Sequence, residues 1–193
     1  MADEPPTSPP APEPAAPAPP PRKTLLTKEE RLVAKAADFR WPKGDDTLDP
    51  MSFPYHEAGH TIVGLALGRR LRYVSIEPGD QMSDFEPITG TDRASVETWI
   101  KTALGGPIAE QRRFGVSWGC KTDVAGIRDE IEKNLPGVEE LGFVTMVSQE
   151  VARLLTVHEE ALQALAGALF VKKRLTGEEV AKLCAIDDTP ARG

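Results

Sequence analysis

The stretch from Phe53 to Gly68 reads FPYHEAGHTIVGLALG, and apolar residues cover nearly every side of its second half. This pattern predicts a helix that begins near Ser52 or Phe53 and ends at Gly68. Ser52 can cap its first turn, where Pro54 is also tolerated, and glycine is common just past a helix end. Because a helix that is apolar all round has no face suited to water, we expect this one to be buried.

Outward from this helix, the pattern is mainly α with a small β element. The sequence predicts one strand over residues 70–76 (RLRYVSI) and favours a second near Ile88. A further helix is expected over 92–104, and the helical pattern resumes up to residue 113 after a break or kink at the Gly-Gly-Pro of 105–107. Two more helices are expected over 123–134 and 144–170. Thr176 and Glu179 cap a short last helix. We therefore predict a mainly helical fold.

Composition divides the chain into four parts. Residues 1–22 are rich in proline and alanine and cannot bury apolar surface, so we expect a disordered, extended arm. Residues 23–50 are interpreted as a linker with a short amphipathic helix over 24–40, where Thr27 and Glu30 form a capping box. A folded domain is expected over residues 51–186, followed by a disordered tail over 187–193.

Charge, cysteine content and hydropathy argue against several classes of protein. The 193-residue chain has a formal net charge of -7, and phosphate contacts need clustered Lys and Arg, so we expect no nucleic-acid binding. Cys120 and Cys184 are its two cysteines, which favours a reducing compartment, the cytoplasm, and rules out a cysteine-based metal site. The most apolar stretch, 61–68, is far shorter than the roughly 20 residues of a membrane helix, so we expect no transmembrane segment.

Residues 56–60 (HEAGH) match the HExxH pattern of zinc hydrolases. On a helix, His56 and His60 lie one above the other, so both imidazoles can bind one Zn²⁺ ion. The carboxylate of Glu57 would lie beside that ion. Glu57 would act as the base that takes a proton from zinc-bound water as it attacks a carbonyl, and would then pass that proton to the leaving amine.

A five-residue pattern can also arise by chance, and two histidines in a helix need have no function. The predicted burial argues against chance, because an unpaired carboxylate inside a protein is costly and needs a partner. A metal ion supplies a partner for these polar groups. Gly59 lies inside the same helix and costs about 1 kcal/mol relative to alanine, which indicates close packing at that point.

Two histidines leave the site one protein ligand short, because catalytic zinc usually takes three protein ligands and a water. The remaining histidine, His158, is predicted inside the long helix and is interpreted as a partly exposed helix residue. Carboxylates are better candidates, and the pattern alone does not choose among them: Glu110, Asp123, Asp129 and Glu130.

Four segments together resemble the peptidase domain of FtsH-type ATP-dependent zinc metalloproteases. Residues 53–68 resemble the family's YHEAGHA motif and the apolar run after it. Residues 103–110 (ALGGPIAE) are similar to its LGGRAAE helix, residues 117–123 (SWGCKTD) to its STGASND segment, and residues 150–179 to its closing helices with their LTGEE ending. The resemblance covers about residues 52–185 and implies an FtsH-peptidase-like helical fold.

The resemblance also implies roles for single residues. Asp123 corresponds to the family's third zinc ligand. Glu110 would then support the ligands or the structure rather than bind the metal. Tyr73, Val74 and Ser75 correspond to the family's region near the substrate edge, where a peptide could pair by strand addition.

The chain departs from the family in lacking a membrane anchor and an ATPase module, whose GxxxxGK[ST] phosphate loop is missing. The resemblance therefore implies a zinc-dependent metalloendopeptidase that cleaves polypeptides alone or with a separate ATPase partner, and it leaves open whether the chain forms a homo-oligomer. The alternative is a catalytically silent, metal-bearing regulator or adaptor that binds a partner through the fold or the Pro-rich arm. The intact Glu57 favours the enzyme.

Overall fold

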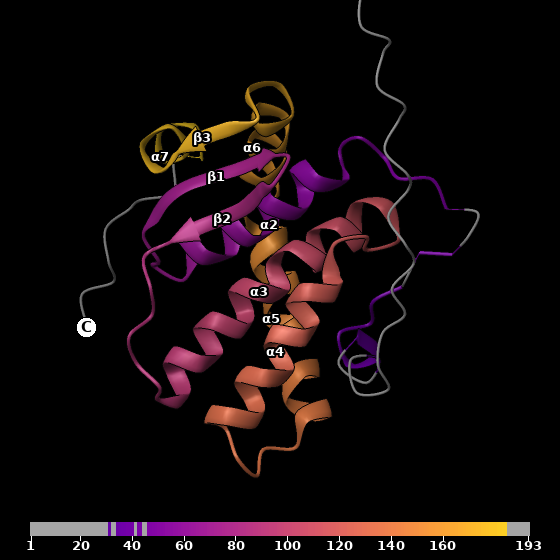
Figure 1. The fold of residues 1–193 in the computed structure, drawn as a ribbon, viewed down its shortest axis with the longest axis vertical. Helices are drawn as coiled ribbons and strands as arrows, with labels where there is room; N and C mark the ends of the chain where they lie inside the picture. Colours follow the sequence, from indigo (N-terminus) through magenta and orange to yellow (C-terminus); the bar gives the residue numbers. More distant parts are fainter. Residues whose placement is uncertain (1–30, 32–33, 41, 44–45, 185–193) are drawn as a thin grey trace, which may run out of the picture.

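The computed structural model describes residues 31, 34–40, 42, 43 and 46–184, which form a mainly helical fold with a small sheet (Figure 1). The predicted fold class is confirmed. The predicted Pro-rich arm, the capping box at Thr27 and Glu30, and the C-terminal tail lie outside the described residues. The elements follow in the order α2 (Ser52–Ala66), β1 (Leu71–Glu77), β2 (Asp80–Phe85), α3 (Arg93–Phe114), α4 (Cys120–Asn134), α5 (Glu140–Val157), α6 (Glu159–Lys172), β3 (Arg174–Thr176) and α7 (Gly177–Cys184).

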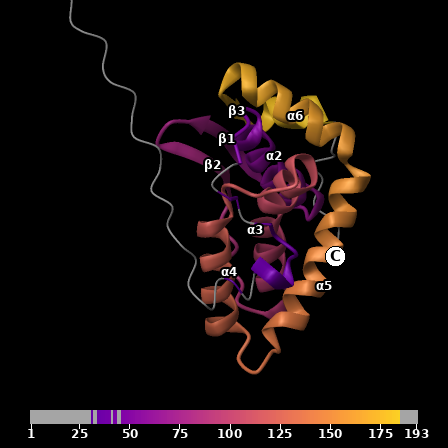
Figure 2. The same ribbon diagram turned by 90° about the vertical axis from the view of Figure 1, so that its right-hand side faces the viewer.

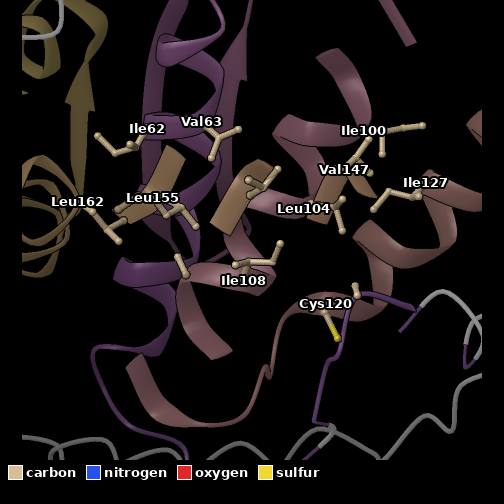
Figure 3. Close-up of a cluster of buried hydrophobic side chains, with 14 of the residues drawn as sticks. Ile62, Val63, Ile100, Leu104, Ile108, Cys120, Ile127, Val147, Leu155 and Leu162 are labelled. Carbon is tan, nitrogen blue, oxygen red and sulfur yellow. The ribbon is translucent and has the colours of Figure 1, made fainter. Parts of the chain in front are cut away.

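Helix α2 is the centre of the fold. It packs most extensively against α3, and it also contacts α5, α6, β1 and β2. Nearly all of its residues are buried, which confirms the prediction made from its apolar faces. Figure 3 shows Ile62 and Val63 of α2 beside core side chains that include Leu104 of α3 and Leu155 of α5.

The two ends of α2 form in different ways. Met51 rather than Ser52 takes the N-cap position, and no side chain caps the helix, so the predicted cap is wrong. The Ser52 hydroxyl instead donates to the carboxylate of Glu110 at 2.5 Å. At the other end Gly68 has a φ of +76°, and the amides of Gly68 and the next residue donate to carbonyls of the last turn. This is a Schellman ending, which confirms Gly68 as the stop.

Helix α3 runs without a break from Arg93 to Phe114, so the break expected at residues 105–107 does not occur. Asp92 caps it, as its predicted start implied, by accepting a hydrogen bond from the amide of Ser95 at 3.1 Å. Proline inside a helix removes one backbone hydrogen bond and is locally unfavourable. Burial of the Gly-Gly-Pro turn against α2 stabilises the continuous helix instead.

Glycines let α2 and α3 cross at very close range. An added Cβ on Gly59 would lie 2.6 Å from the Cβ of Ala109 and would also overlap the carbonyl of Gly105. An added Cβ on Gly105 would lie 2.5 Å from the carbonyl oxygen of Gly59. The close packing predicted at Gly59 is therefore confirmed, and it brings the HExxH turn directly onto α3.

The long helix predicted over residues 144–170 is two helices, α5 and α6, which meet at an angle of 80°. His158 lies between them with φ −106° and ψ 27°. Figure 2 shows α5 rising along one side of the molecule and α6 turning across its top. Because both helices pack on α2, the bend lets one amphipathic segment cover two sides of the central helix. Within the described residues no single helix is long and apolar enough to cross a membrane, although α5 and α6 together pass that test as a bent pair.

The sheet has the order β2-β1-β3, and both pairings are antiparallel. The strand predicted over 70–76 is confirmed as β1, but the second strand is β2 and not a strand near Ile88. Strand β3 pairs with Tyr73, Val74 and Ser75 on one side, and β2 pairs with them on the other. The prediction that a peptide pairs at these three residues is therefore wrong, because their backbone already has partners on both sides.

The structure describes part of the short helix predicted over 24–40 and the start of the predicted last helix. Of the helix expected over 24–40, the described residues 31 and 34–36 are helical, but the chain has left the helix by Asp38, whose φ is +57°. The capping box of the last helix is confirmed. The amide of Thr176 donates to the Glu179 carboxylate at 2.9 Å, and the Glu179 amide donates to the Thr176 hydroxyl at 3.3 Å.

Candidate metal centre

Three side chains from two helices converge on one point. His56 and His60 come from α2 and Asp123 comes from the first turn of α4, with one ligand atom of each within 4.8 Å of the others. The two Nε2 atoms are 3.0 Å apart, and the Asp123 oxygens lie 3.2 Å and 3.5 Å from them. Ligand atoms of a tetrahedral zinc ion lie roughly 3.3 Å apart, so this triangle fits one ion.

Backbone and carboxylate partners orient both imidazoles. The Nδ1 of His60 lies 2.8 Å from the carbonyl of Thr102, which can only accept, and 3.2 Å from the amide of Gly106, which can only donate. The shorter contact favours a proton on Nδ1. The Nδ1 of His56 lies 3.2 Å from the Glu110 carboxylate and donates to it. Both Nε2 lone pairs therefore face each other. Two facing lone pairs at 3.0 Å need a cation between them, either a proton or a metal ion.

The charges around the rings also favour a cation. Burial alone would lower the pKa of His56, but hydrogen bonds to Asp123 and Glu110 outweigh burial and raise that pKa to about 10. Burial would raise the pKa of Asp123, but the histidines hold it below its ordinary value. Asp123 Oδ2 is buried 3.2 Å from His56 Nε2, and among the described residues no hydrogen bond from an amide or hydroxyl reaches it. A buried carboxylate oxygen whose neighbour is an oriented imidazole fits a metal ion.

Glu110 supports this group from behind His56. Its carboxylate is fully buried and accepts hydrogen bonds from the hydroxyls of Ser52 and Ser117, the amide of Gly119 and the ring of His56. These donors come from α2 and from the segment that leads into α4. Glu110 therefore contacts Nδ1, on the side of the ring away from the proposed ligand atom, and it orients a ligand instead of joining the group.

Two further glycines leave room for the rings. An added Cβ on Gly106 would lie 2.7 Å from His60 Cδ2, and one on Gly119 would lie 2.7 Å from His56 Cε1. Any side chain at either position would displace an imidazole. The sequence showed these glycines, but only the packing of α3 and α4 on α2 shows which ring each one touches.

Glu57 faces the same space from α2 and is only 6% exposed. The Ser83 hydroxyl lies 3.1 Å from Glu57 Oε2 and 2.9 Å from the Glu57 carbonyl, so it can donate to either. The hydroxyl of Thr61 lies 2.9 Å from that of Ser83. Sequence reasoning missed Ser83, because it lies on β2, a strand that the pattern placed elsewhere.

The remaining sequence candidates lie apart from this group. Asp129 is exposed on α4, and Glu130 accepts a hydrogen bond from the side chain of Asn134. His158 stands at the bend between α5 and α6. Residues 73–75 lie in the central strand β1 and do not line the cavity beside the histidines. Among the carboxylates left open by the pattern, Asp123 is the one that lies beside the Nε2 atoms of both histidines.

The group opens into a cavity of about 490 Å³. Residues 81–85 of β2 form one wall, and Trp99, Thr102 and Ala103 of α3 form another. Successive residues of a strand point in opposite directions, so five in a row can line one cavity when the strand edge faces it. The edge of β2 away from β1 has no partner strand among the described residues.

A scan against protein-family models finds no matching family, and no curated protein matches this chain. The chemistry of the site therefore rests on the residues and contacts described above.

Proposed function

We propose that this chain is a zinc-dependent metalloendopeptidase, in which His56, His60 and Asp123 bind the ion and Glu57 is the catalytic base. One observation carries the proposal: the metal-binding group and the Glu57 carboxylate face the same cavity, beside a free strand edge. A set of two imidazoles and one carboxylate suits zinc. The resemblance of residues 52–185 to FtsH-type peptidases supports the same reaction.

Each polar residue of the site has a part in this reaction. Zinc bound at the site would supply the Lewis acidity that activates water for attack on a peptide carbonyl. Glu57 takes the proton of the attacking water and delivers it to the leaving amine. The Ser83 hydroxyl holds the Glu57 carboxylate toward the cavity. Glu110 and the carbonyl of Thr102 keep the histidine Nε2 lone pairs directed at the ion.

The substrate that suits this cavity is an extended polypeptide. The free edge of β2 offers backbone donors and acceptors to a peptide that adds as a further strand. Such pairing lays successive peptide bonds past Glu57, because Ser83 of the same strand contacts Glu57. A folded protein has few free extended segments, so unfolded or flexible chains are the substrates that we propose.

The test is cleavage of fluorescent casein by the zinc-loaded full chain. The parent protein should cleave casein, a chelator should stop cleavage, and added zinc should restore it. Glu57→Gln should retain zinc but lose at least about 100-fold in rate, which is the range of general-base catalysis. The control is Glu132→Gln on α4, whose side chain is 74% exposed, and it should cleave as the parent does.

Two outcomes would contradict the proposal. A parental rate in Glu57→Gln would show that Glu57 is not the base. A parent protein that binds zinc but cleaves neither casein nor short peptides, with or without a separate ATPase, would show that the chain is not a peptidase. That second outcome would favour a metal-bearing regulator or adaptor domain.

A further inference from the structure

Arg69 lines the cavity and follows shortly after the end of α2. Its guanidinium carbon lies 4.3 Å from the centre of the Phe85 ring, and Nη2 lies 3.4 Å from the carbonyl of Glu86. The ring of Phe85 is itself held in place beside α2, because an added Cβ on Gly64 would lie 2.6 Å from a ring atom. The guanidinium therefore rests on a fixed aromatic platform and lines the same cavity as the metal-binding group.

Arg69 has no counter-ion among the described residues. Glu57, Asp84 and Asp123 also line the cavity, yet within the described part of the chain no carboxylate lies at ion-pair distance from Arg69. Asp84 pairs with Arg72 at 3.5 Å. The Nε of Arg69 is buried without a hydrogen-bond partner, and burial lowers the pKa of the side chain. A partly buried cation without a counter-ion gains more from an incoming carboxylate than an exposed one does.

The positions of Arg69 and Glu57 can be compared along strand β2, because each contacts one of its residues. Ser83 contacts Glu57, and Phe85 lies beneath the Arg69 guanidinium. These two strand residues are separated by about 7 Å, the rise of two residues. A peptide that pairs along β2 keeps the same spacing, so its residue beside Arg69 lies two positions from the residue beside Glu57.

We propose that Arg69 recognises a carboxylate of the substrate peptide two residues from the scissile bond, and so makes the enzyme prefer acidic sequences or chain ends. The inference rests on the proposed function, whose cavity and strand edge it uses. The carboxylate belongs to an Asp or Glu side chain or to the C-terminus of the peptide. Either source presents the same two oxygens to the planar guanidinium, and this fork geometry is the one that arginine binds best.

The experiment compares matched fluorogenic peptides on the zinc-loaded full chain. One pair carries Glu or Gln two residues before the cleaved bond, a second pair carries them two residues after it, and a third ends there with a free or an amidated C-terminus. The quantity measured is the ratio of kcat/KM values within each pair. We expect a ratio of about ten in favour of the carboxylate in at least one pair, as for a charge-assisted hydrogen bond.

Two variants identify Arg69 as the cause. Arg69→Gln should reduce the ratio to about one. Arg70→Gln removes the same charge from the next residue, which is exposed and does not line the metal cavity, and it should leave the ratio unchanged. If Arg69→Gln fails to fold, Arg69→Lys keeps the charge without the planar fork and should lower the ratio at least threefold.

A ratio near one in all three pairs, or a ratio of ten that survives these Arg69 substitutions, would overturn the inference. Failure of the peptidase itself is distinguished by binding. The same peptides are bound to zinc-loaded Glu57→Gln, with and without Arg69→Gln, and followed by fluorescence anisotropy. A preference for the carboxylate that requires Arg69 supports the inference even if the parent cleaves nothing, whereas equal binding of both peptides refutes it.

Discussion

The carboxylate of Glu110 is fully buried and contacts His56, one of the proposed metal ligands. Its hydrogen bonds make this burial tolerable. Removal from water disfavours its charged form, but the hydrogen bond from His56 and those from Ser52 and Gly119 hold its pKa below the ordinary value. A charged Glu110 keeps the proton of His56 on Nδ1. Glu110 would thus act on metal binding through one imidazole and not through direct contact.

We therefore expect Glu110→Gln to fold and to bind zinc about 10 to 100 times more weakly than the parent. The amide keeps the shape of the side chain but removes the negative charge that orients the His56 ring. Competition with a chromophoric chelator at fixed pH measures the affinity. Asp129→Asn, at an exposed position of α4, is the control and should bind zinc like the parent. Parental affinity in Glu110→Gln would mean that the Glu110 charge has no such effect.

The sequence predicted part of this site and missed the rest for identifiable reasons. The spacing of His56 and His60 is local to one helix turn, so the pair could be read directly. The pattern left Asp123 as one of four candidate carboxylates, and only the resemblance chose it, because nothing local links it to residues more than 60 positions earlier. Ser83 and the carbonyl of Thr102 were missed, since backbone acceptors and distant hydroxyls leave no pattern in a sequence.

At the scale of elements, the crossing of α2 and α3 determines where the histidines lie. Gly59 and Gly105 bring the two backbones together, and this contact places His60 against Thr102 of α3. The same contact stabilises α3 at residues 105–107, where the Gly-Gly-Pro sequence locally disfavours a helix. Packing between elements therefore decides both the geometry of the ligands and the continuity of the helix.

Gly59→Ala should lower the free energy of unfolding by about 1 to 3 kcal/mol, as overpacking of a tight core does. Its methyl group would overlap the backbone of α3. Gly167→Ala on α6 is the matched control, because the added methyl group meets no atom within 4 Å apart from the nearby backbone of its own helix and its chain neighbours, and it should stabilise the protein by about 0.4 to 1 kcal/mol. Urea denaturation of both variants measures the two changes. Equal effects would show that the helices do not touch at Gly59.

The free edge of β2 leads to a prediction about the substrate backbone. A peptide that pairs with β2 donates amide protons to it, so N-methylation of one pairing amide should reduce kcat/KM about tenfold, while methylation of the next amide, which points away, should have little effect. A series of singly methylated peptides on the zinc-loaded parent measures this alternation. A smooth dependence on position, without alternation, would contradict strand addition.

The elements that the sequence mispredicted share one cause. Residues 144–170 contain no proline at the bend, and their apolar spacing continues through His158, so nothing local marked the turn between α5 and α6. The turn exists because both helices pack on α2. Strand β2 was missed because its sequence, DQMSDF, has few β-formers and is held by pairing with β1. In both cases tertiary packing outweighs local preference.

At the scale of the whole molecule, the metal-binding group joins parts of the chain that are distant in sequence. His56 and His60 belong to the central helix, whereas Asp123 lies in the first turn of α4, a helix that packs mainly against α3. An ion bound by all three residues would tie the start of α4 to α2. Metal binding and the stability of the fold are therefore coupled.

Zinc should consequently raise the thermal midpoint of the full chain. A ligand that binds only the folded state stabilises it by about 2.7 kcal/mol at 100 times its dissociation constant, and by about 4.1 kcal/mol at 1,000 times. Asp123→Asn removes the ligand that joins α4 to α2, so the same zinc concentration should stabilise this variant far less, whereas Asp129→Asn should respond like the parent. Calorimetry across a zinc titration, with a chelator as the zero point, measures the three responses. An equal response of Asp123→Asn and the parent would exclude Asp123 as a ligand and would leave the two histidines to bind the ion without α4.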